Sequence, residues 1–92
     1  MAAERLVLEM TIGREDFLRR LPQAVGGFVE DGNTFIADDH RWRLRITPLA
    51  SDRLGVLDLE RLRVEFDFPG LGAAERDAFL ARFRLHYHRG GG

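Results

Sequence analysis

The sequence contains no cysteine and no lysine among its 92 residues. Without cysteine, the chain has no disulfide scaffold, thiolate metal ligand, cysteine nucleophile or iron–sulfur cluster. Without lysine, it has neither Schiff-base chemistry nor a lysine general base. No apolar run approaches the roughly 20 residues of a membrane-spanning helix, and no signal-peptide pattern precedes the first alternating segment. We therefore expect a cytoplasmic protein that makes no membrane contact.

Neither sign of charge dominates, because 14 basic residues stand against 15 acidic ones and the formal net charge is -1. This balance argues against bulk electrostatic attraction to nucleic acid. A hydrophobic content of 45% is ordinary for a globular protein. The length predicts one domain over residues 1–92, with residues 89–92 as a frayed glycine-rich tail. Basic residues that are all arginine and spread along the chain are typical of a GC-rich bacterial genome.

Apolar and other residues alternate with period two in several segments, which predicts strands. The Asp31-Gly32 pair predicts a two-residue hairpin turn that sets Phe28 opposite Phe35. Residues 48–55 are expected to form a loop. Leu57 and Leu59 have the opposite parity to the residues after them, so we expect a bulge or bend near Leu59–Arg61. The predicted strands cover residues 6–12, 28–30, 33–37, 41–47 and 62–68.

Two segments have helical spacing instead. The first is expected over residues 14–21, because Pro22 ends or kinks it. The second begins after Gly72, a fair N-cap, with Glu75 at the positive helix end. Its apolar stripe ends at Tyr87, and the glycines from Gly90 onward stop it. That stripe contains Phe79, Leu80, Phe83 and Tyr87.

The resulting order βαββββα predicts an α+β fold in two layers. We expect a four- to five-stranded antiparallel sheet, a short helix after strand 1, and a long C-terminal helix packed on one face. This element order resembles the helix-grip topology of TATA-box-binding repeats, a likeness of fold that implies no function. The expected core consists of Leu8, Met10, Trp42, Leu44, Ile46, Val64, Phe66, Phe79 and Phe83.

Arginines line the expected solvent face of the sheet. A register that sets Arg43 opposite Glu65 and Arg41 opposite Asp67 neutralises both and leaves Arg45 beside Arg63. That unpaired end is the best candidate for binding an anion, a nucleic acid or an acidic partner. The candidate binding residues are Arg45, Arg63, Arg43 and Arg41. The alternative is a solvated face with cross-strand ion pairs.

No convergent catalytic, cofactor-binding or metal-binding set is visible. His86 and His88 are two apart, so on a helix they point roughly 200° apart and cannot share a metal. Asp38, Asp39 and His40 are explained by a tight turn. We expect no catalytic residue, no cofactor and no metal. A strip of small residues on the second helix indicates a possible helix–helix contact: Ala74, Ala78, Ala81 and Leu85.

By elimination, we expect a non-enzymatic binding or protein-interaction module whose partner is another protein or a second copy. Two alternatives stay open. The first is nucleic-acid or anion binding through the arginine face. The second is a small-ligand binder or enzyme with a pocket between the sheet and the C-terminal helix, for which Glu30 and Asn33 are the polar candidates.

Overall fold

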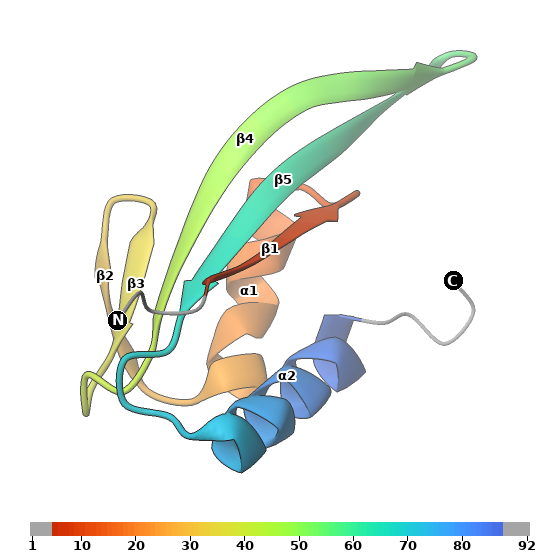
Figure 1. Ribbon diagram of the computed structural model, residues 1–92. Helices are drawn as coiled ribbons and strands as arrows, with labels where there is room; N and C mark the ends of the chain where they lie inside the picture. The colour runs from red at the N-terminus through yellow and green to blue at the C-terminus, as the bar shows by residue number, and fades with distance from the viewer. Residues whose placement is uncertain (1–4, 88–92) are drawn as a thin grey trace.

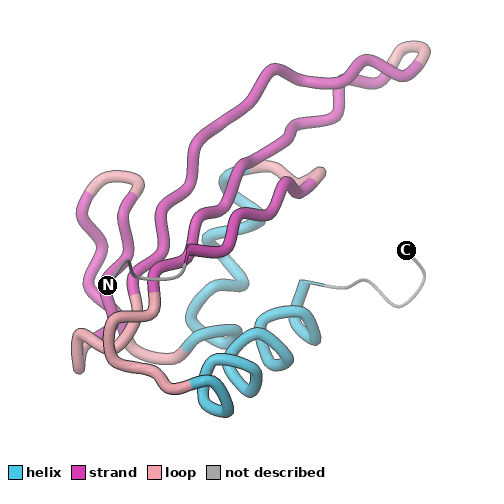
Figure 2. Tube along the Cα trace, viewed as in Figure 1, coloured by secondary structure: helices cyan, strands magenta, loops and turns pink. Residues whose placement is uncertain are grey.

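The computed structural model describes residues 5–87. The elements are β1 (Arg5–Met10), α1 (Arg14–Val25), β2 (Phe28–Asp31), β3 (Thr34–Ala37), β4 (Arg43–Leu54), β5 (Leu57–Asp67) and α2 (Ala73–Tyr87). The strands form one antiparallel sheet in the order β1-β5-β4-β3-β2, and both helices lie on one face of it (Figure 1; Figure 2). This is the predicted two-layer α+β architecture. The predicted tail at 89–92 and His88 lie outside the described residues.

The core lies between the inner face of the sheet, which is the face toward the helices, and the two helices. Six of the expected core residues are buried: Trp42, Leu44, Ile46, Val64, Phe66 and Phe83. Leu8, Met10 and Phe79 are only half-buried. For Leu8 and Met10 the reason is their place on β1, an edge strand. The buried residues outside the expected set are Phe17, Leu21, Ala24, Val25, Phe35, Ala37, Leu62 and Phe68.

Helix α1 extends four residues past its predicted end and contains Pro22. The prediction that Pro22 ends the helix is wrong because tertiary packing favours one more turn. That turn buries Ala24 and Val25. Their burial offsets the helical hydrogen bond that Pro22, which has no backbone N–H, cannot donate. The Gly26 amide donates to the Pro22 carbonyl at 3.0 Å and closes the turn. As a result, α1 contributes four buried residues to the core and α2 contributes only Phe83.

Both predicted hairpin registers are wrong by two residues. Phe28 lies opposite Ala37 instead of Phe35, and Gly32 opens the two-residue turn with φ 64°, as in type II′ turns. Between β4 and β5, Leu44 lies opposite Phe66 instead of Val64. A shift of two residues leaves every side chain on its predicted face, since the side-chain period of a strand is two.

The segment expected to be a loop at residues 48–55 is instead strand as far as Leu54. β4 continues to Leu54, and a two-residue turn leads directly into β5. Beyond their last pairings with β3 and β1, the two strands project as a two-stranded ribbon, residues 47–61, which we call the arm (Figure 1). Pro48 is tolerated there because β4 no longer pairs with β3. The bulge expected near Leu59–Arg61 is on the other strand: the register shifts between Leu49 and Asp52, so the extra residue lies on β4, opposite the expected position, and β5 keeps one parity throughout.

Candidate functional site

Three of the four candidate arginines lie on the outer face of the sheet, which points away from the helices. Arg43 and Arg45 are exposed and lie opposite Asp67 and Glu65. The predicted pairing of Arg45 with Arg63 does not form, because the register is shifted by two residues. Arg45 and Arg63 are therefore not direct cross-strand neighbours, and the repulsion between them that an anion was expected to relieve is absent.

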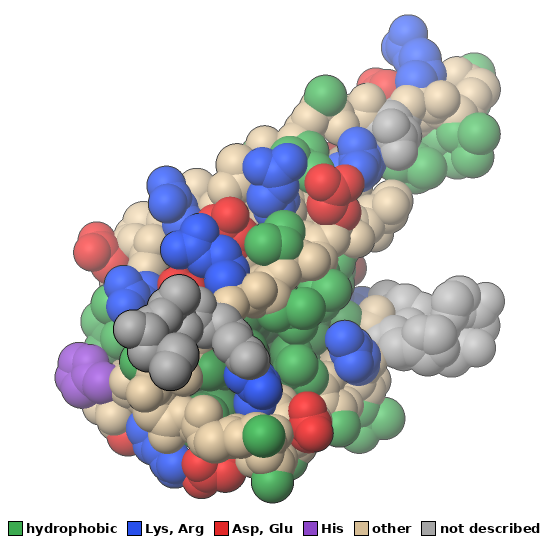
Figure 3. All heavy atoms as spheres, in the orientation of Figure 1, with side chains coloured by type: hydrophobic (Ala, Val, Ile, Leu, Met, Phe, Trp, Pro, Cys, Tyr) green, Lys and Arg blue, Asp and Glu red, His purple; other side chains and the backbone are tan. Residues whose placement is uncertain are grey.

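Arg63 lies opposite Thr47 on one side and Glu9 on the other. Its guanidinium is 3.7 Å from the Glu9 carboxylate. The same carboxylate forms an ion pair with Arg61 at 2.6 Å. Figure 3 shows acidic and basic side chains interleaved along this part of the molecule. The face is a mixed-charge surface with cross-strand ion pairs, and whether it binds an anion stays a prediction.

Arg41 lies away from the outer face, so its predicted position opposite Asp67 is wrong. Its Nε donates to the Gly70 carbonyl at 3.0 Å and its Nη2 donates to Glu75 at 2.6 Å. Glu75 also accepts from the Gly72 amide at 3.0 Å, which is half of a capping box and confirms the predicted helix start. These contacts raise the pKa of Arg41 and lower the pKa of Glu75. Arg41 thus ties the start of α2 to the segment before β4.

The apolar side chains change face in the arm. β5 alternates without interruption, so Leu57 and Leu59 share the outer face with Arg61, while Glu60 points inward. The Glu60 carboxylate lies against Gly13 at the start of α1, which confirms this orientation. The bulge on β4 places Leu54 directly opposite Leu57. Consequently the outer face is charged over the body of the sheet and carries Leu54, Leu57 and Leu59 at the end of the arm.

The end of the arm is strongly exposed. Leu54 is 65% exposed, Leu57 56% and Val56, in the turn, 97%. The charged pair Arg53–Asp58, 3.4 Å apart, lies on the opposite face of the ribbon. Figure 3 shows hydrophobic side chains gathered at this end of the molecule. Scattered exposed apolar residues are normal, but a contiguous group on one projecting element makes this end a candidate interaction surface.

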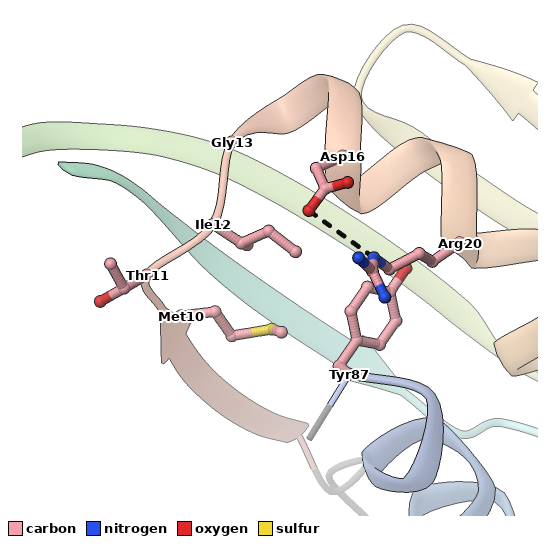
Figure 4. A pocket seen from close by; sticks show the side chains of 7 residues that line it. All are labelled: Met10, Thr11, Ile12, Gly13, Asp16, Arg20 and Tyr87. Atoms are coloured by element: carbon pink, nitrogen blue, oxygen red, sulfur yellow. Dashed lines mark ion pairs between the residues drawn. The ribbon is translucent and has the colours of Figure 1, made fainter. Parts of the chain in front are cut away.

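A cavity of about 310 Å³ lies where the start of α1, the segment after β1 and the end of α2 meet. Figure 4 shows the side chains of Asp16, Arg20 and Tyr87 converging on it from two helices. The cavity is lined by Met10, Thr11, Ile12, Gly13, Asp16, Arg20 and Tyr87. It brings the chain's residues 10–20 together with Tyr87, which no spacing in the sequence indicated.

Arg20 is the notable group in this cavity. Its Nε is buried and, among the described residues, has no hydrogen-bond partner. The Asp16 carboxylate lies 3.6 Å from it, an ion pair too long for a hydrogen bond. Asp16 also pairs with Arg19, which is mostly exposed. One carboxylate is therefore shared between two guanidinium groups.

Tyr87 forms one wall of the cavity. Its hydroxyl donates to the Phe17 carbonyl at 2.5 Å, and its ring stacks on Phe17 at a centroid distance of 4.8 Å. Burial is the main cause that raises the pKa of Tyr87, and the Arg20 guanidinium opposes it. The hydroxyl therefore stays protonated and holds the end of α2 against α1.

A second, more apolar groove of about 410 Å³ adjoins this cavity. It is lined by Leu8, Glu9, Met10, Phe83, Arg84 and Tyr87. Met10 and Tyr87 line both spaces. Arg20 lines the first space, and the second lies between β1 and α2.

The polar candidates named from the sequence are elsewhere. Glu30 does share a face with Phe28 and Phe35, but it is exposed, and Asn33 is in the turn. Asn33 accepts a hydrogen bond from the Arg14 Nε at 3.1 Å. The signal for Arg20 was its spacing of four residues from Asp16 on a helix, but such pairs are usually surface pairs.

The small-residue strip on α2 is exposed at Ala74, Ala78, Ala81 and Leu85. Within residues 5–87, no three His, Asp or Glu side chains lie close enough to hold a metal ion. Among the described helices, none combines the length and apolarity that crossing a membrane requires. No protein-family model matches the chain, and no curated protein matches it in sequence.

Proposed function

We propose that the protein is a non-enzymatic protein-interaction module and that the outer face of the arm is its contact surface. The observation that carries this proposal is that uninterrupted alternation along β5 places Leu57 and Leu59, and the bulge on β4 places Leu54, on the side of the ribbon away from the helices. A bacterial cytoplasmic setting, as expected from the sequence, belongs to the same proposal.

The ribbon itself supports this reading. Within residues 5–87, residues 47–54 of β4 pair only with β5, and residues 57–61 of β5 pair only with β4. No third strand of the described chain covers either edge of the arm. A two-stranded hairpin is only marginally stable by itself in water, and open edges and an apolar face are what a partner covers. The arm is therefore expected to gain order when another chain binds.

The size of the exposed apolar group sets the expected affinity. Burying a Leu or Val side chain contributes roughly 1.5–3 kcal/mol. Since Leu54, Val56 and Leu57 are each more than half exposed, covering all three contributes about 3–6 kcal/mol. Matching apolar surface from the partner adds a similar amount, against an association cost of roughly 4–15 kcal/mol. These contacts alone support a micromolar or weaker complex.

The chemistry of the arm favours a protein partner with an apolar surface. The only charged side chains of the ribbon's end described here, Arg53 and Asp58, pair with each other on the opposite face. A nucleic acid would need exposed cations or stacking aromatic rings, and the outer face of the arm's end offers leucine and valine.

The test is a photo-crosslinking residue at position 56 in cells of the natural host. We expect a discrete crosslinked protein that disappears when Leu54 and Leu57 are both replaced by threonine, which keeps strand propensity and removes apolar surface. Val29→Thr is the matched control, because Val29 is 59% exposed on β2, outside the arm. Crosslinking that survives the double substitution, or that is lost equally with Val29→Thr, would refute the proposal.

A second candidate is anion binding by the outer-face arginines. The observation that favours it is that Arg43 and Arg45 are exposed, and Arg63 lies on the same face. Titration with phosphate or short RNA should then move the amide signals of residues 43–47 and 61–65, with shifts that fade as salt is added. Shifts elsewhere, or none at millimolar ligand, would remove this candidate.

A further inference from the structure

We infer that the cavity at Arg20 binds a small amphiphilic carboxylate, with its anionic end at Arg20 and its apolar part in the groove between β1 and α2. This site is separate from the arm and independent of the interaction proposed for it. The inference depends on four features of the described residues: an unmatched donor, a local charge that suits a monoanion, a neighbouring apolar groove and a suitable volume.

The unmatched donor is the buried Arg20 Nε. Buried donors in proteins are nearly always paired, and a guanidinium presents its donors in a fork that fits a carboxylate. Figure 4 shows the Arg20 guanidinium lying between Asp16 and the Tyr87 ring, at the cavity lined by Met10 and Ile12. The Arg20 side chain is 26% exposed, so part of it is open to an anion although the Nε itself is covered.

The local charge favours a monoanion. Asp16 is the one carboxylate lining the cavity, and it pairs with both Arg19 and Arg20. Within the cavity lining the charges of Arg20 and Asp16 balance, so no net negative charge opposes a monoanion. A single carboxylate matches this charge better than a doubly charged phosphate does.

The neighbouring apolar groove defines the rest of the ligand. The groove beside the cavity offers Leu8, Met10, Phe83 and the Tyr87 ring, with Glu9 and Arg84 at its rim. Glu9 is already paired with Arg61, so it does not repel the ligand strongly. Volumes of about 310 and 410 Å³ lie in the range of small-molecule sites.

The experiment is a titration of the full chain with octanoate below its micelle concentration, followed by backbone amide shifts. Acetate, which lacks the apolar part, and 1-octanol, which lacks the charge, are titrated in parallel. We expect saturable octanoate shifts at residues 10–13, 16–20 and 84–87, and at least about tenfold weaker binding of each comparison compound, or about 1.4 kcal/mol.

Matched variants separate the roles of the two neighbouring arginines. Arg20→Gln should weaken octanoate binding at least tenfold, whereas Arg19→Gln should leave it within twofold, because Arg19 does not line the cavity. Arg20→Lys keeps the charge without the planar fork and should bind between wild type and Arg20→Gln. The amide spectrum of each variant shows whether it is folded.

Equal weakening by the Arg19 and Arg20 substitutions would overturn the inference. So would equal binding of octanoate and 1-octanol, octanoate shifts centred on the outer-face arginines, or no saturation at millimolar octanoate. None of these results bears on crosslinking from position 56, so the inference and the proposed function fail or stand separately.

Discussion

Replacing Phe83 with alanine is expected to remove a large share of the protein's stability. Phe83 is only 1% exposed. Its ring centroid lies 4.6 Å from that of Tyr87, 5.0 Å from Phe66 and 6.2 Å from Phe17. It therefore joins α2 both to α1 and to the sheet. A buried Phe→Ala change costs about 3–5 kcal/mol, and the loss of several ring contacts favours the upper part of that range.

That loss compares with a total stability of roughly 5–14 kcal/mol for a domain of this length. In urea, an unfolding slope of about 1–3 kcal/mol per molar converts it into a midpoint lowered by more than about 1 M. The assay is equilibrium denaturation followed by circular dichroism. Leu85→Ala is the matched control on the same helix, because Leu85 is 75% exposed, and it should change stability by less than about 0.5 kcal/mol.

The reasoning about the core is refuted if the Phe83→Ala and Leu85→Ala midpoints move by the same amount. A Phe83→Ala variant too unstable to purify is examined through Phe83→Leu, which keeps part of the apolar volume and should lose less stability.

Two further predictions concern the tie between Arg41 and the start of α2. Gly70→Ala should destabilise the protein by about 1–3 kcal/mol, because the added Cβ would lie 2.8 Å from the Arg41 Cα; a thermal midpoint equal to wild type would show that this close approach can relax. Glu75→Gln should lower stability at neutral pH and should no longer do so in acid. The pKa of Glu75 is lowered from 4.5 by the Gly72 amide and Arg41, so its contribution is present above pH 4.5 and is lost as the pH falls through the lowered value. Parallel pH–stability curves for wild type and Glu75→Gln would contradict this assignment.

Local chemistry determined much of the fold. Alternation along residues 62–68 identified a strand and its buried side, because the two faces of a half-buried strand meet different solvents. Gly72 and Glu75 marked the start of α2, since a helix start needs groups that satisfy its free amides. The reversed parity of Leu57 and Leu59 predicted an irregularity at the right level of the β4–β5 pairing but on the wrong strand.

Tertiary structure decided the strand registers and the end of α1, which the local patterns do not determine. A shift of two residues preserves every face, so alternation cannot choose between Phe66 and Val64 as the partner of Leu44; turn geometry and packing choose Phe66. Pro22 lies inside α1 because the residues after it are buried against other elements.

The candidate sites divide in the same way. The sequence by itself determined that arginines alternate on the solvent side of a sheet, because that depends only on neighbours along one strand. Which carboxylates lie beside them depends on the register between β4 and β5. The observed register sets Arg45 opposite Glu65, so the predicted Arg45–Arg63 pairing does not form. The cavity at Arg20 joins α1 to Tyr87, 67 positions later in the chain. Such a site exists only after folding, since contacts between distant residues carry no local signal in a single sequence.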